Sequence, residues 1–315
     1  MLTTSLNARF VKDMKLPITI YKEPFFSERL KALDSVYDCV KYYKLFEEEV
    51  GSFNNPEDYF AEYNRVKDDA ISFIKSTDGW LRFNAEPHEV LKAKNLGYRS
   101  KDIYTDMYRN KYFISVDIRK ANFSVLRKYS PSIFGYAKTW EEFLSKFTTF
   151  KTIIDSKYIR QVVLGNCNPS RVISYEKLLM TQIAEKLTET IKFSVVFFSN
   201  DEIIFEISES DIKSFDTIKA TVNCVSDEFE IPLRVECFKL LQLSNNLGFI
   251  KEDCSGENLK NKYTFKCLDG DFAHIIIKRM TNQEIINDDK CVYFKGFIAE
   301  LKELPEFEII KEDFK

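Results

Sequence analysis

The fold is decided by KYFISVDI (residues 111–118) and FSVVFFSNDEIIFEI (residues 193–207). The first stretch is rich in β-formers and ends close to an acid, Asp117, which predicts a buried strand. The second predicts two strands joined by a tight turn, because residues 199–201 (SND) are turn formers. A further strand is expected at IPLRVEC (231–237). The sequence therefore predicts an α+β fold built on one antiparallel sheet.

Two helices are expected to cover one face of this sheet. The first follows Asn168 and Pro169, a pair typical of a capped helix start, and extends over residues 169–188 with one apolar stripe. The second covers residues 211–225. The predicted order is therefore strand, helix, hairpin, helix, strand.

Three regions are predicted along the chain. Residues 1–110 are mainly helical, residues 111–240 form a central domain with a helical insertion at 135–165, and residues 241–315 are rich in strands. Within the last region, FAHIIIKRM is an apolar run with three β-branched residues, which favours a strand. His274, in this run, is expected to be a structural histidine.

The composition excludes several classes of site. The two histidines and seven cysteines show no zinc-ligand spacing, and no glycine-rich phosphate-binding motif is present. Nucleotide chemistry would therefore have to use metal held by carboxylates. The cysteines form no CxxC pair, and neither a signal peptide nor a membrane span is evident, so we expect a cytoplasmic protein with reduced thiols. The abundance of Phe, Tyr, Lys, Ile and Asn is typical of an AT-rich, virus-encoded sequence.

Charge is unevenly distributed. Residues 92–192 carry 19 Lys and Arg against 9 Asp and Glu, a net charge of +10, although the whole chain has −3. A basic block between acidic flanks is typical of a surface that binds a polyanion.

Two acidic positions are attached to buried strands, namely Asp117 and the pair Asp201–Glu202. A carboxylate is costly to bury without a partner, and like charges in one small space repel unless divalent cations bridge them. If the strand end meets the hairpin turn, these acids satisfy the requirement of two-metal nucleotidyl transfer. In that reaction Mg²⁺ or Mn²⁺ activates a 3′-hydroxyl and holds the triphosphate.

The motifs, in this order, resemble the palm domain of right-hand nucleic acid polymerases. VDIRKANFSVL (116–126) is similar to the first palm motif, LGNCNPSRVISYEKLLM (164–180) to the second, and FFSNDEIIFEI (197–207) to the third. The first two lean toward reverse transcriptases and viral RNA polymerases, and the third toward family A DNA polymerases. The resemblance covers about residues 111–240 and implies an antiparallel, RRM-like palm sheet with packed helices.

The resemblance also implies residue roles. Asp117 and Asp201 would bind the metal, and Asp117, Asp201 and Glu202 would be the catalytic acids. Nucleotide contacts are expected from Arg119, Lys120, Asn122, Arg160 and Lys239, and nucleic-acid contacts from Asn166, Asn168, Arg171 and Lys177.

We therefore predict a metal-dependent nucleotidyltransferase that extends a primed nucleic acid template from nucleoside triphosphates. The alternative is a catalytically degenerate palm-fold protein that binds nucleic acid or has a structural, viral role. The short segment before Asp117 favours this alternative, because it leaves little room for complete polymerase fingers. The acidic C-terminal region is a candidate docking surface for a protein partner, and no membrane association is expected.

Overall fold

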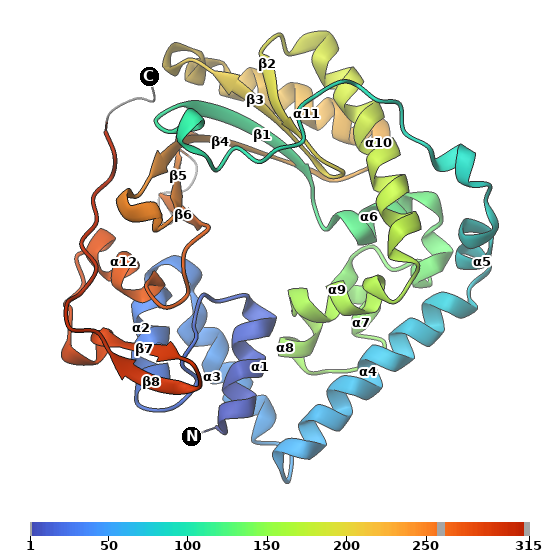
Figure 1. Cartoon of the computed structure of the whole chain (residues 1–315). Helices are drawn as coiled ribbons and strands as arrows, with labels where there is room; N and C mark the ends of the chain where they lie inside the picture. The colour runs from blue at the N-terminus through green and yellow to red at the C-terminus, as the bar shows by residue number, and fades with distance from the viewer. Residues whose placement is uncertain (1, 257–261, 312–315) are drawn as a thin grey trace.

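The chain is a mixed α/β protein with a central antiparallel sheet (Figure 1). The computed structural model describes residues 2–256 and 262–311. In these residues the main sheet has the strand order β2-β3-β1-β4-β5-β6. Its strands are β1 (Tyr112–Ile118), β2 (Ser194–Phe198), β3 (Glu202–Ile207), β4 (Leu233–Gln242), β5 (Phe249–Asp253) and β6 (Tyr263–Lys266).

The four predicted strands lie together in this sheet, as expected. Strand β1 pairs with β3 on one side and with β4 on the other, and β2 pairs with β3. The turn between β2 and β3 is closed by Ser199, whose hydroxyl accepts a hydrogen bond from the backbone N–H of Glu202 at 3.0 Å. The prediction that the 111–118 strand shares a sheet with the 193–207 hairpin is confirmed.

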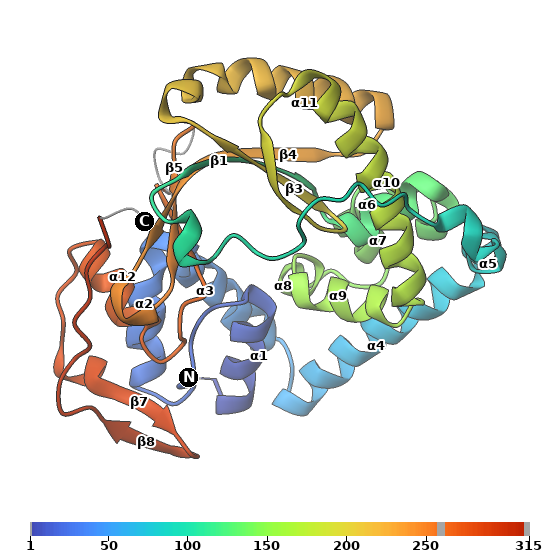
Figure 2. The same cartoon turned by 45° about the horizontal axis from the view of Figure 1, so that its top comes forward.

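Two long helices cover one face of the sheet. They are α10 (Pro169–Thr190) and α11 (Phe215–Phe229), and Figure 2 shows α11 lying across the strands. Apolar side chains of β1 and β3, among them Val116 and Phe205, belong to the same buried cluster as Leu179 and Val222 of these helices. Helix α10 begins at Pro169 as predicted, but Asn168 does not cap it. Its backbone is left-handed (φ 50°), and its side-chain amide instead donates to Asn84 Oδ1 at 2.6 Å.

The opposite face is only half covered by apolar residues. Ile103 and Tyr108, from the segment before β1, pack against Phe113, Ile204 and Phe238. We call this side of the sheet the open face. Its remaining half carries charged side chains.

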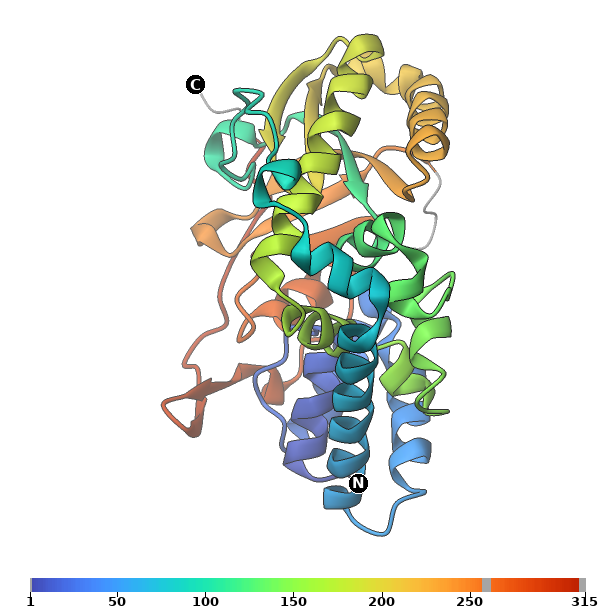
Figure 3. The same cartoon turned by 90° about the vertical axis from the view of Figure 1, so that its right-hand side faces the viewer.

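Helices form the rest of the structure. In Figure 1 the elements follow one another around a ring, and Figure 3 shows the N-terminal helices at the end opposite the sheet. Asn55 caps α4, its side chain accepting from the N–H of Asp58 at 2.9 Å, and the chain turns at Asp38 (φ 49°), which separates α2 from α3. The N-terminal helices are α1 (Thr4–Met14), α2 (Phe25–Tyr37), α3 (Cys39–Val50), α4 (Pro56–Ser76) and α5 (Asp78–Ala85). Between β1 and α10 lie α6 (Ala121–Tyr129), α7 (Trp140–Leu144), α8 (Lys151–Ile154) and α9 (Lys157–Gly165).

The C-terminal region differs from the prediction. The FAHIIIKRM run forms helix α12 (Ala273–Met280), so the expected strand is wrong. A short buried apolar run does not distinguish strand from helix by its pattern alone, and here contact with α2 favours the helix. The boundary expected at residue 240 falls inside β4, and β5 and β6 extend the main sheet. Strands β7 (Cys291–Phe294) and β8 (Phe297–Glu300) form a separate hairpin.

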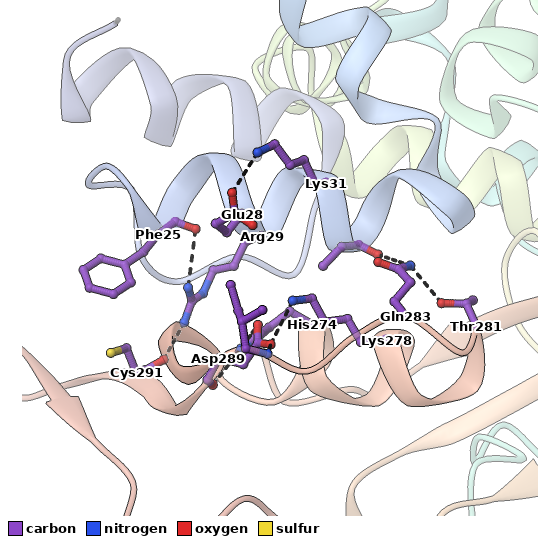
Figure 4. A network of polar contacts seen from close by, with 12 residues as sticks. Phe25, Glu28, Arg29, Lys31, His274, Lys278, Thr281, Gln283, Asp289 and Cys291 are labelled. Carbon is purple, nitrogen blue, oxygen red and sulfur yellow. Dashed lines mark hydrogen bonds and ion pairs between the residues drawn. The ribbon is translucent and has the colours of Figure 1, made fainter.

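A buried polar network joins the two ends of the described chain (Figure 4). Arg29 of α2 donates to the carbonyl oxygen of Cys291, and Lys278 of α12 lies 2.8 Å from Asp289 Oδ2. His274 Nε2 lies 3.0 Å from the carbonyl oxygen of Asp289. Burial lowers the pKa of His274 to about 4, so the ring is neutral at pH 7 and has the structural role expected for it.

None of the helices in residues 2–256 and 262–311 combines the length and apolar composition needed to cross a membrane.

Candidate functional site

Charged side chains from neighbouring strands gather at one end of the open face. Successive side chains of a strand point to opposite faces, so Asp117 and Ser115 project from the face opposite Val116. In the strand register, Asp117 lies beside Glu202 of β3 and beside Arg234 of β4. The sheet therefore brings an acid, a second acid and a base into adjacent positions.

Arg234 holds Asp117 in a two-pronged ion pair. Its Nε lies 2.8 Å from Asp117 Oδ1 and its Nη2 lies 3.1 Å from Oδ2. The same guanidinium lies 3.2 Å from Glu236, which also lies 3.4 Å from the buried Lys251 of β5. The open face thus carries alternating charges, and in this conformation the Asp117 carboxylate is neutralised by Arg234 rather than left unpaired.

Glu202 faces the same space. The Ser115 hydroxyl donates to its carboxylate. Burial raises the pKa of Glu202, and the charges of Asp117 and Asp201 raise it further, while Lys251 and the Ser115 hydrogen bond oppose the shift. The negative charges of Asp117 and Asp201 are therefore close enough to act on the Glu202 carboxylate.

Asp201 lies in the turn, one residue before β3. Its backbone carbonyl accepts from the N–H of Ile118 at 2.8 Å, which ties the turn to the end of β1. Its exposed carboxylate accepts from the Ser199 hydroxyl at 3.0 Å. The strand end and the turn meet as the sequence predicted, but the register partner of Asp117 is Glu202.

A further acid, Glu176 of α10, lies behind the turn. It is only 5% exposed, and its Oε1 has no hydrogen-bond partner. Burial, and to a smaller extent the charge of Asp201, raise its pKa to about 8. Glu176 is therefore protonated at pH 7.

The donor chemistry of this site suits a hard divalent cation. Carboxylate oxygens are the ligands that Mg²⁺ and Mn²⁺ prefer. Burial is the main cause of the raised Glu202 pKa, and a bound cation would offset it together with the smaller repulsion from Asp117 and Asp201. Among the described residues, no three acidic, histidine or cysteine side chains already form a closed ligand group. Cation binding would require Asp117 to exchange its contact with Arg234 for the metal.

The residues expected to contact nucleotide lie on several different elements, and one of them, Lys239, is on the other face of the sheet. Arg119, two positions after Asp117, is exposed, and Asn122 lies in the first turn of α6. Lys120 forms an ion pair of 2.6 Å with Glu141. Lys239 belongs to the face of β4 opposite Arg234, and its ammonium lies 5.0 Å from the Tyr112 ring, so the structure does not bring it to Asp117. Arg160 lies on α9.

The four residues expected to contact nucleic acid have partners within the protein. Arg171 donates to the carbonyl oxygens of Phe83 and Glu86. Lys177 donates to the carbonyl oxygen of Ser199 at 3.3 Å and lies over the Phe198 ring. The Asn166 amide donates to Val162 at 2.8 Å, and Asn168 is bound to Asn84.

Arg234, Glu236 and Lys251 were not predicted from the sequence. The signal for the first two was present in LRVEC, where charged residues alternate with apolar ones and therefore share one face of a strand. Lys251 lies in a short strand with no clear alternation, and only the pairing of β5 with β4 places it here.

Comparison with protein family models, curated proteins and solved structures finds no match for this chain.

Proposed function

We propose that this chain is a metal-dependent nucleotidyltransferase with a palm-type sheet, which extends a primed nucleic acid from nucleoside triphosphates. The observation that carries the proposal is the pairing of Asp117 with Glu202, beside the Asp201 turn, on the face opposite the two helices. The order strand, helix, hairpin, helix, strand supports it, with β1 central between β3 and β4.

In this proposal Asp117, Asp201 and Glu202 hold Mg²⁺ or Mn²⁺. The metal, when bound, supplies a Lewis acid that lowers the pKa of a 3′-hydroxyl and neutralises triphosphate charge. Glu202 is kept in place by Ser115, and Asp201 by Ser199, so two of the three carboxylates are oriented before metal arrives. Asp117 would have to leave Arg234 to hold a metal, and the Arg234 guanidinium could then donate to a phosphate oxygen.

The ion pair between Asp117 and Arg234 favours a second candidate function. In a palm-type protein that has lost its catalytic activity, basic side chains of the protein itself would neutralise the acids of the site, as Arg234 neutralises Asp117 here. The chain would then be a degenerate palm-type protein that binds nucleic acid without extending it.

Primer extension with the purified chain separates these functions. Primed DNA and RNA templates are offered with labelled ribo- or deoxyribonucleotides and either Mg²⁺ or Mn²⁺, and incorporation is read on a gel. We expect the wild type to incorporate nucleotides, and Asp117→Asn and Asp201→Asn to abolish incorporation, because each substitution removes a ligand charge. Glu48→Gln, an exposed acid of α3, is the control and should retain full activity.

Retained activity in Asp117→Asn would refute the proposed site. A wild type that binds the template but incorporates nothing with either metal would establish the degenerate alternative instead.

A further inference from the structure

Helices α1 and α9 bring four basic side chains together. They are Lys12 of α1, Lys15 directly after it, and Lys157 and Arg160 of α9, and we call them the α1–α9 cluster. A cavity of about 610 Å³ opens between the helices, and Lys12, Lys15 and Tyr158 are among its lining residues. The Lys12 ammonium lies 4.3 Å from the centre of the Tyr158 ring.

Hydrogen bonds to the buried Asp13 carboxylate connect α1 to α9 and to α4. Asp13 of α1 accepts hydrogen bonds from the hydroxyl of Ser156, the cap of α9, at 2.8 Å and from Tyr63 of α4 at 3.0 Å. The guanidinium of Arg9 lies over the rings of Tyr63 and Tyr158. The basic side chains of the α1–α9 cluster therefore extend from helices whose relative position is fixed by these contacts.

Among the described residues the α1–α9 cluster has no close ion pair, although Glu141 lies within electrostatic range of Arg160 and Asp13 within that of Lys12. In the described ranges, 2–256 and 262–311, no carboxylate lies within 4.0 Å of the charged nitrogens of these four side chains. Burial and then the charge of Arg160 lower the pKa of Lys15, and burial and then Lys15 and Arg160 lower that of Lys157. The cations therefore repel one another, and an anion bound between them would remove that repulsion.

The α1–α9 cluster lies on the same side of the sheet as the acidic site. Figures 1 and 2 show α9 and α1 next to each other, across from the side of the sheet that carries α11. Lys157 lies within electrostatic range of both Asp117 and Arg234. One extended anion can therefore reach from the cluster toward Asp117.

We propose that the α1–α9 cluster binds the phosphate groups of a nucleotide or of a nucleic acid strand that reaches the Asp117 site. Two lysines that line the cavity, together with two further cations on the adjoining helix α9, match a ligand with successive negative charges. Lysine and arginine are the usual donors to phosphate oxygens. The identity of the ligand rests on the proposed function, whereas the phosphate site itself rests on the cluster.

The test compares two triple variants with equal loss of charge. The first, Lys15→Gln with Lys157→Gln and Arg160→Gln, removes three cations of the cluster. The control, Lys41→Gln with Lys44→Gln and Lys213→Gln, removes three exposed lysines elsewhere. Binding of a fluorescent single-stranded oligonucleotide is measured by anisotropy over a range of salt, and inorganic triphosphate and ATP are measured by calorimetry without divalent metal.

We expect the cluster variant to lose affinity by about tenfold or more, and the control to change little. If a strand is the ligand, the slope of log affinity against log salt also falls by about 2, since each phosphate contact contributes about 0.7 for single strands. A loss for triphosphate and ATP alone assigns the site to the nucleotide, and a loss for the oligonucleotide alone assigns it to the strand.

Equal affinities in the two variants would overturn the proposal. Circular dichroism verifies folding, and the single variant Lys157→Gln, at the first residue of α9, repeats the test if the triple variant does not fold. A wild type that binds through the cluster but incorporates no nucleotide would contradict the proposed function and leave the phosphate site standing.

Discussion

On β1, Ile114, Val116 and Ile118 point to α10 and α11 and are almost fully buried, whereas Ser115 and Asp117 between them point to the open face. The neighbouring strands repeat this division. Phe205 of β3 faces the helices, and Glu202 and Arg234 face the other way. The helix-covered face therefore stabilises the fold through burial of apolar side chains. The open face holds charged side chains in fixed positions, and their ion pairs add little to the stability. Three substitutions test this division.

The largest effect on stability is expected from the helix-covered face. Phe205→Ala should lower the free energy of unfolding by about 3–5 kcal/mol, because it removes a fully buried ring and leaves a cavity. Urea unfolding measures the change. Phe297→Ala removes the same side chain from the exposed β7–β8 hairpin and should cost far less. Similar losses in the two variants would contradict the division.

Glu176 is the exception on the helix-covered side, because its carboxyl is buried there. Its folded-state pKa of about 8 lies above the usual value of 4.5, so its contribution to stability falls as pH rises from 4.5 to 8. Glu176→Gln should match the wild type near pH 4.5 and exceed its stability near pH 9, by on the order of 5 kcal/mol at about 1.36 kcal/mol per pKa unit. Unfolding curves across this range give the difference, and a constant difference at all pH values would refute the assignment.

The smallest effect on stability is expected at Asp117. Asp117→Asn weakens an ion pair whose arginine is half exposed, so the cost should be about 1 kcal/mol or less. The same variant should lose nucleotide incorporation, which separates function from stability on the open face. A loss of several kcal/mol in urea unfolding would show that Asp117 is a structural residue.

The sheet could be predicted from sequence because strand signals and turn residues agreed along residues 111–237. KYFISVDI and the SND turn indicate strand and hairpin by local chemistry, and the antiparallel order follows from them. The helix α12 could not be predicted, because Ile275, Ile276 and Ile277 suit a buried strand as well as a buried helix. Its packing against α2, nearly 250 residues earlier in the chain, decides between them.

The candidate site was predictable only in part, for a related reason. Asp117 and the turn acids are visible as charges attached to apolar strands, but strand register decides that Glu202 lies beside Asp117 and that Arg234 pairs with it. The roles expected for Arg171 and Asn168 depended on free side chains, and tertiary hydrogen bonds to α5 and the residue after it use them instead. Basic residues from α1, far from the basic block in sequence, join it only in the folded chain.

Binding of Mn²⁺ to the open face tests the central claim most directly. The electron paramagnetic resonance signal of free Mn²⁺ is titrated with wild type, Asp117→Asn, Arg234→Gln and the control Glu48→Gln. We predict that Asp117→Asn weakens binding by about tenfold or more and that Glu48→Gln leaves it unchanged. Arg234→Gln should tighten binding, because Asp117 then has no internal cation to release. Equal Mn²⁺ affinity in the wild type, Asp117→Asn and Arg234→Gln would contradict the assignment of these carboxylates as a metal site.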